Sequence, residues 1–335
     1  MNKLSKIGAS ALAGSLMALS ANALEVSLSG GASVGVGQSN QTKGSYYFMN
    51  DSINFTVSGE TDGGLTVTTK LELDGGYAQS ASNPYDNSSI SIANDMGTLT
   101  FHKHGGDSVM SGWDDVVPTA YEEPWAMAVH ASTASSSADS QTTLINGLSG
   151  NNLWRYDSPS FNGVSVHASY LQAAQTEVGS SQGSVAAYND FGIQISPEMV
   201  DGLSIGYAMG TVQEAATIEN DESTMWVKYV YGPVTLGYQM SEVDGQTTSE
   251  DDESTGYGLS YAVSDSLSIS YGVHTLDLGD KNGASTDQES SGFSFSYTMG
   301  GATIAGAFNQ MDNMHGATNV GADVDSFELG VAFAF

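Results

Sequence analysis

Large apolar residues recur at every second position through most of this chain, and this period is what most limits its possible folds. The last nine residues, 327–335, read "FELGVAFAF" and set five apolar side chains on one parity: Phe327, Leu329, Val331, Phe333 and Phe335. A period of two predicts β-strands with one apolar face. The opposite parity holds small residues, as in Ser268, Ser270 and Gly272, instead of the large charged groups that usually cover a soluble sheet.

The same alternation runs along the chain, and we find no helical period after Leu24. It is clearest in the segments 26–36, 53–57, 65–73, 203–209, 225–231, 234–240, 257–263, 267–273 and 293–297. Such strands fit two architectures. A soluble sandwich would bury the apolar parity against a second sheet, whereas a membrane barrel would turn that parity toward lipid.

The connections between the strands favour the barrel, because long and short ones alternate without a break. The short connections are 60–64, 95–97, 158–163, 197–202, 231–233, 263–266 and 299–301. The long ones lie near 38–51, 75–87, 105–151, 172–184, 211–222, 242–254, 277–290 and 310–324. Eight long loops and seven short turns imply sixteen strands. The sequence therefore predicts an all-β transmembrane antiparallel barrel over 24–335, with short periplasmic turns, long extracellular loops and both termini on the periplasmic rim.

The first residues predict export. Lys3 and Lys6 precede an uncharged apolar run of about 14 residues, shorter than the ~20 that a membrane-spanning helix needs. Small residues follow at Ala21 and Ala23, the two positions that a signal peptidase reads. We expect residues 1–23 to be a signal peptide that is cut before Leu24.

The charge is strongly negative, with 8 lysines and arginines against 38 aspartates and glutamates and a formal net charge of −30. Removal of residues 1–23 takes away Lys3 and Lys6 and leaves six basic side chains. So few cations cannot build a face for nucleic acid, which we exclude as a partner. The chain has no cysteine, so disulfide scaffolds, cysteine–zinc sites and cysteine nucleophiles are also excluded.

The third long loop, 105–151, differs from the others in length and content. It contains Trp113, Tyr121 and Trp125, which a loop in open solvent does not need but a loop folded against a wall does. Its acidic residues are Asp107, Asp114, Asp115, Glu122 and Glu123.

These features together resemble the Gram-negative general porins, over essentially all of 24–335. The stretch 152–170, "NLWRYDSPSFNGVSVHASY", resembles the porin segment in which a Y-x-SP-x-F-x-G turn joins strands six and seven. The stretch 97–115, "GTLTFHKHGGDSVMSGWDD", resembles the strand that leads into the inward-folded third loop of that family. The C-terminal Phe335 resembles the family's assembly signal.

The resemblance implies a homotrimeric diffusion channel, integral to the outer membrane, in contact with lipid and lipopolysaccharide. It also implies a constriction between carboxylates of the third loop and basic residues of the opposite wall. The acidic candidates are the five third-loop residues named above. The basic candidates are Lys70, His102, His104, Arg155 and Lys228. By parity, His102 and His104 face the lumen with Thr100, whereas Lys103 has the outward parity of Phe101.

The basic wall of this chain is sparser than the arginine cluster that the family usually carries there. Acidic linings favour cations, and low-dielectric walls focus the field of the lining charges. We therefore expect a passive channel for small hydrophilic solutes that prefers cations. A solute-specific channel and an outer-membrane barrel enzyme remain as alternatives, the enzyme being less compatible with sixteen strands.

Two groups of residues raise the question of bound metal. His102 and His104 lie two residues apart, a spacing that can chelate a metal on one face of a strand. The run 249–254, with Glu250, Asp251, Asp252 and Glu253, could hold calcium. The simpler interpretations are polar lumen residues for the histidines and a solvated acidic loop for the run.

Overall fold

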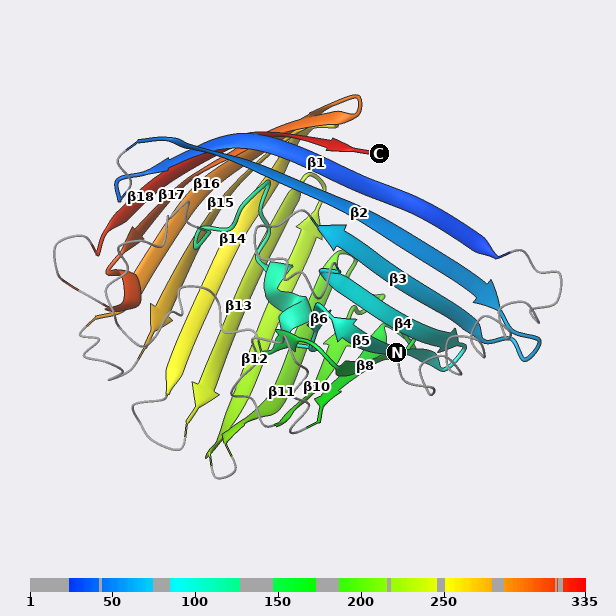
Figure 1. The fold of residues 1–335 in the computed structure, drawn as a ribbon. Helices are drawn as coiled ribbons and strands as arrows, with labels where there is room; N and C mark the ends of the chain where they lie inside the picture. The colour runs from blue at the N-terminus through cyan, green and yellow to red at the C-terminus, as the bar shows by residue number, and fades with distance from the viewer. Residues whose placement is uncertain are drawn as a thin grey trace.

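The structure is a computed structural model that describes residues 24–41, 44–74, 85–126, 147–172, 187–215, 218–245, 251–278, 286–316, 318 and 322–335. Sixteen strands form one closed antiparallel barrel (Figure 1). They are β1 (Glu25–Ser39), β2 (Tyr46–Glu60), β3 (Thr66–Asp74), β4 (Asn87–Asn94), β5 (Gly97–His104), β8 (Leu153–Asp157), β9 (Val164–Leu171), β10 (Ala187–Ile195), β11 (Leu203–Ala215), β12 (Ile218–Tyr231), β13 (Val234–Asp244), β14 (Asp252–Ser264), β15 (Leu267–Asp277), β16 (Gln288–Met299), β17 (Ala302–Asp312) and β18 (Val324–Ala334). The predicted strand number and antiparallel order are confirmed.

The last strand closes the barrel against the first. β18 pairs with β1 from Gly31 opposite Ala334 to Ser39 opposite Ser326, and the backbone of Phe335 exchanges two hydrogen bonds with Gly30. The Phe335 side chain is 71% exposed. The C-terminal residues thus form the strand that closes the barrel, and their large apolar side chains face outward. Because β18 pairs with β1, neither strand is left with an unpaired edge between them.

The two faces of the wall follow the two parities of the sequence. Large apolar side chains such as Tyr257, Leu259 and Tyr271 are exposed on the outer surface. The residues between them, such as Gly258 and Ser270, point into the barrel, where the third loop lies against them. An apolar outer surface of this extent is what a barrel presents to lipid.

Several loops are shorter than the sequence predicts, because the strands continue into them. β11 ends at Ala215 and β12 begins at Ile218, so most of the expected loop 211–222 is a β-hairpin. Polar residues in this region pair across the strands, as Thr211 does with Asp221. Hydrophobic alternation marks only the part of a strand that meets lipid, and it fails to report the polar extension beyond it.

The third long loop, which we call loop 3, covers residues 105–152 between β5 and β8. It contains β6 (Gly106–Asp107), which pairs with β7 (Ser149–Gly150), and the short helix η1 (Ser111–Val116). Figure 1 shows η1 inside the ring of strands. A second short helix, η3 (Met314–Gly316), follows β17. Neither of these helices, nor any other in the described ranges, is long and apolar enough to cross a membrane.

Candidate functional site: the barrel lumen and loop 3

Loop 3 is attached to the inner wall by an apolar cluster. Trp113 of η1 packs edge-on against Trp226 of β12, with 5.5 Å between the ring centroids. The cluster contains Val109, Met110, Trp113 and Val116 from the loop and Leu153, Leu171, Tyr188, Ala208 and Trp226 from the wall. Burial of rings this large stabilises the attachment by several kcal/mol, at roughly 1.5–3 kcal/mol for each large side chain. The prediction that the aromatic residues of the loop fold against a wall is confirmed.

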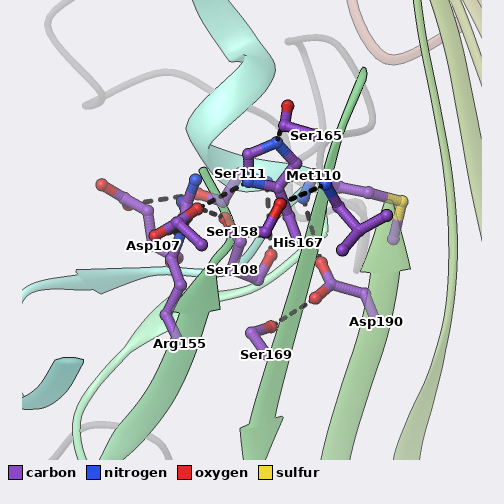
Figure 2. A network of polar contacts seen from close by, with 12 residues as sticks. Asp107, Ser108, Met110, Ser111, Arg155, Ser158, Ser165, His167, Ser169 and Asp190 are labelled. Atoms are coloured by element: carbon purple, nitrogen blue, oxygen red, sulfur yellow. Dashed lines mark hydrogen bonds and ion pairs between the residues drawn. The ribbon is translucent and has the colours of Figure 1, made fainter. Parts of the chain in front are cut away.

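A buried carboxylate adds a polar anchor beside this cluster. Asp190 of β10 is 4% exposed, and its Oδ2 accepts hydrogen bonds from the Met110 backbone N–H at 3.0 Å and from the Tyr188 hydroxyl at 3.1 Å. The Ser169 hydroxyl donates to the Oδ1 atom (Figure 2). One side chain therefore joins two neighbouring strands to the start of η1. The sequence analysis did not single out Asp190, although its inward parity, shared with Tyr188, was readable.

A row of glycines makes room for the middle of loop 3. Gly237, Gly258, Gly272 and Gly292 are direct cross-strand partners on the inner face of β13 to β16. A Cβ atom at Gly258 would lie 2.8 Å from Val117 Cγ1, and one at Gly272 would lie 3.1 Å from Pro124 Cγ. The loop backbone can approach the wall closely because these four positions carry no side chain.

Residues 120–126 of loop 3 are held by hydrogen bonds to β15, β16 and β17. The Ala120 N–H donates to the Ser270 hydroxyl oxygen at 2.9 Å, and the Tyr121 N–H donates to Ser294 Oγ at 3.0 Å. Asn309, 3% exposed, donates from Nδ2 to the carbonyl oxygens of Glu123 at 2.8 Å and Ala126 at 2.7 Å. From Met110 to Ala126, loop 3 therefore follows the inner wall from β10 around to β17.

Two of the cavities lined by described residues lie between loop 3 and the opposite wall. The first, of about 430 Å³, we call the Lys70 cavity. Its charged or titratable lining residues are Lys70, Glu72, His102, Asp107, Arg155 and Asp157. The cations in this lining come from β3 and β8, whereas Asp107 comes from loop 3. The cavity is thus lined by both signs of charge.

Arg155 is largely neutralised by its neighbours. Its Nε donates to Asp157 Oδ1 at 3.1 Å, and its Nη1 donates to the carbonyl oxygens of Ser108 at 2.9 Å and Asp107 at 3.3 Å. This guanidinium is therefore a third attachment point for loop 3. Because Asp157 shares its charge with Arg155, the pair contributes little net field to the passage.

His167 lies between Asp157 and Ser165, at 2.7 Å from Asp157 Oδ1 through Nδ1 and at 3.0 Å from Ser165 Oγ through Nε2. Figure 2 shows the His167 ring beside Ser165. Carboxylate, imidazole and hydroxyl follow in the order of a serine hydrolase triad. Here, however, Asp157 is already paired with Arg155, so the three side chains are better explained as part of a network of charged and polar groups on the barrel wall that includes Arg155.

The second cavity, of about 330 Å³, we call the Phe48 cavity. It is lined by Tyr46, Phe48, Asn50, Glu122, Ala126, Ala307, Asn309, Ser326 and Glu328. The Tyr121 hydroxyl of loop 3 donates to Glu328 Oε1 at 2.5 Å. Burial, followed by this hydrogen bond, raises the pKa of the Tyr121 phenol, which therefore remains a donor at neutral pH.

The predicted acidic residues take different places. Asp107 lines the Lys70 cavity and accepts a hydrogen bond from the Ser111 hydroxyl at 3.2 Å, and Glu122 lines the Phe48 cavity. Asp114 is exposed on η1, and Glu123 is half-buried where its carbonyl meets Asn309. The Asp115 side chain lies outside what the structure describes. Sequence reasoning did not select Glu72 and Glu328, whose inward parity was the available signal.

The predicted basic residues also separate. Lys70, His102 and Arg155 line the Lys70 cavity together. Lys228 has the inward parity of Trp226 but lines neither cavity. A bulge between Ser88 and Ser89 shifts the pairing of β5, so His104 lies opposite Ser88, and it is not among the residues that line the Lys70 cavity.

The structure describes both histidines of one candidate metal site and three of the four carboxylates of the other. His102 and His104 are separated by the bulge, as described above. Asp252 is buried and has the inward parity, Glu253 next to it is exposed, and Asp251 accepts a hydrogen bond from the Gly245 N–H. Glu250 lies outside the described residues. Successive residues of a strand point to opposite faces, so neighbouring carboxylates at 252 and 253 cannot share one ion. Within the part that the structure describes, no group of three or more metal-binding side chains is found.

The geometry defines a class of protein: a sixteen-stranded barrel, which is wide enough to leave an aqueous channel, with one loop folded against its inner wall. A family model described as Gram-negative porin matches residues 8–313, and the chain belongs to that family. It is a non-enzymatic diffusion channel, integral to the outer membrane. Two solved structures show the fold. The anion-selective porin from Comamonas acidovorans has a TM-score of 0.69 and 16% identity over 93% of this chain and 100% of that one. A triple mutant of the Rhodopseudomonas blastica porin has a TM-score of 0.66 and 16% identity with the same coverage. No curated protein matches the chain.

Proposed function

We propose that this porin passes small hydrophilic solutes and ions and prefers cations to anions. The observation that carries the proposal is the balance of charge along the open side of loop 3. The carboxylates there are Glu72, Asp107, Glu122, Asp157 and Glu328. Against them stand Lys70 and Arg155, and Arg155 is paired with Asp157. The net charge of the described lining is negative, which attracts cations within low-dielectric walls.

The Comamonas acidovorans porin, which is anion-selective, does not argue against this proposal. At 16% identity the likeness extends to the barrel and not to its lining charges. With 8 lysines and arginines in the whole chain, this protein has few residues from which an anion path could be made.

The proposal predicts a reversal potential of cationic sign. The purified protein would be inserted into a planar bilayer that separates two KCl solutions of different concentration. We expect potassium to be favoured over chloride, and more strongly at low salt, because the Debye length grows from about 10 Å at 0.1 M to about 30 Å at 0.01 M. A reversal potential near zero, or of the opposite sign, would refute the preference.

We further infer that the protein works as a homotrimer, as is typical of the family. The short strands support a subunit contact. β3, β4 and β5 have 9, 8 and 8 residues, whereas β11 and β12 have 13 and 14. A tilted strand needs about 9–11 residues to cross the hydrocarbon layer, and β3 to β5 are at or below that length. A neighbouring subunit would therefore cover the wall at these short strands. Light scattering of the detergent-solubilised protein should give three copies per particle, and a single copy would contradict the inference.

Removal of residues 1–23 during export is also part of the proposal. The first barrel strand begins at Glu25, directly after the expected cleavage site before Leu24. The intact mass of the protein purified from outer membranes tests this, because a mature chain starts at Leu24 and an uncleaved one retains Met1.

A further inference from the structure

The Phe48 cavity combines tyrosine and phenylalanine rings with carboxylates. Tyr46 and Phe48, both on the inward parity of β2, have ring centroids 6.3 Å apart and an interplanar angle of 47°. Glu328 approaches from β18 and Glu122 from loop 3. The other constriction cavity contains charged and polar side chains but neither phenylalanine nor tyrosine.

The position of the two rings is set by glycines in the neighbouring strands. Gly35 of β1 lies between Phe48 and Gly330 in register, and Gly37 lies between Tyr46 and Glu328. A Cβ atom at Gly35 would collide with Phe48 Cζ, and one at Gly37 would lie 2.5 Å from Tyr46 Cζ. The rings therefore lie over the bare backbone of β1 and form a floor beside Glu328.

The carboxylate at the edge of this floor is held in place. Glu328 is half-buried and accepts the hydrogen bond of the Tyr121 hydroxyl through Oε1. Tyr121 is itself fixed by its backbone N–H to Ser294. The opposite side of the cavity is fixed too, since Asn309 holds the loop 3 backbone at Glu123 and Ala126. Both carboxylate-bearing sides are therefore preorganised around the rings.

We propose that the Phe48 cavity is a binding subsite for small organic ammonium ions that carry an apolar group. The proposal rests on the cation preference proposed above and adds a solute class to it. An ammonium group would lie between Glu122 and Glu328, and the apolar part would lie on the rings of Tyr46 and Phe48, where cation–π attraction also acts. A volume of 330 Å³ is at the lower end of the range for small-molecule sites, which suits a solute of this size.

This occupant fits better than an inorganic cation or a neutral solute. Potassium is coordinated by oxygen ligands, which the ring faces of Tyr46 and Phe48 do not supply. A neutral solute gains contact with the rings but no electrostatic attraction from the carboxylates. Only a solute with both a positive group and an apolar body uses all four side chains.

The test is current block in planar bilayers, with 2-phenylethylammonium as the probe. Two matched probes separate the contribution of the ammonium charge from that of the aromatic ring: 2-phenylethanol lacks the charge, and ethylammonium lacks the ring. We expect 2-phenylethylammonium to reduce the potassium current at concentrations about tenfold lower than either matched probe, since each partial contact contributes on the order of 1 kcal/mol.

Variants locate the block. Phe48→Ala and Glu328→Gln should each raise the half-blocking concentration of 2-phenylethylammonium about tenfold. Glu72→Gln, which removes a lumen carboxylate outside this cavity, should reduce cation preference while the half-blocking concentration changes less than twofold. Equal block by the three probes, or block that persists in both cavity variants, would overturn the subsite. Either result together with a cationic reversal potential would leave the proposed ion preference standing, whereas an anionic reversal potential would refute that preference by itself.

Discussion

Replacing Asp190 with alanine should release the start of loop 3 and make the single-channel current unstable. The change removes the acceptor of the Met110 N–H and of the Tyr188 and Ser169 hydroxyls at a site that is 4% exposed. A hydrogen bond to a charged group contributes about 1.5–3 kcal/mol, and part of this is offset because the buried carboxylate is no longer desolvated. With a net loss of about 2 kcal/mol, loop displacement would become about thirty times more frequent.

The measurement is the frequency of current transitions in single-channel records, together with the rate at which an added protease cuts loop 3. Asn189→Ala is the matched control, because Asn189 is the neighbouring residue on β10 and is exposed on the outer parity. If Asp190→Ala gives the same current noise and cleavage rate as Asn189→Ala, the carboxylate does not hold the loop.

Neutralising three lumen carboxylates together should remove most of the cation preference. Glu72, Glu122 and Glu328 line the two constriction cavities from β3, loop 3 and β18. A charge about 8 Å from the ion path changes the ion's energy by about 0.5 kcal/mol even in bulk water. Chloride is shifted by the same energy in the opposite direction, so three Glu→Gln changes amount to about 3 kcal/mol between the two ions, or roughly a hundredfold fall in the potassium-to-chloride permeability ratio.

The matched control removes the same net charge from the outside of the barrel. Glu242, Glu253 and Glu289 are exposed on the outward parity of β13, β14 and β16. Their replacement by glutamine should shift the reversal potential by less than a third of the lumen triple, because screening weakens charges more than a Debye length away. Equal shifts would mean that total surface charge, and not the constriction, determines selectivity.

The strand number could be predicted from the sequence because lipid imposes a local rule. Every barrel strand must turn large apolar residues outward at alternate positions, so segments such as 267–273 and 327–335 can be recognised as strands from their own residues. The same rule does not reach the polar parts of strands, which is why the hairpin at Ala215 and Ile218 was predicted as a loop. It also does not show the bulge at Ser88 and Ser89, which depends on pairing between neighbours.

The path of loop 3 could not be predicted, because residues far apart in sequence determine it. Asp190 meets Met110 across 80 positions. The loop backbone can approach the wall closely only because the registers of β13 to β16 place four glycines side by side. These are Gly237, Gly258, Gly272 and Gly292. Likewise, Tyr46 and Phe48 were visible as residues of one parity, but their place over Gly35 and Gly37 depends on the pairing of β1 with β2.

A disulfide between loop 3 and the glycine row tests the central claim, that loop 3 lies against the inner wall and leaves the passage on its other side. The chain has no cysteine of its own, and Val117 Cγ1 lies 2.8 Å from the Cβ position at Gly258. One C–C bond of ~1.5 Å separates that Cγ1 atom from Val117 Cβ, so the two Cβ positions are at most about 4.3 Å apart, within reach of a disulfide, which needs Cβ atoms about 3.5–4.5 Å apart. The Val117→Cys/Gly258→Cys variant should cross-link on oxidation, seen by peptide mass mapping, and retain its conductance. The Val117→Cys/Leu259→Cys pair, whose second residue faces outward, should not cross-link. Free thiols at 117 and 258 after oxidation, or a cross-link that closes the channel, would contradict the account.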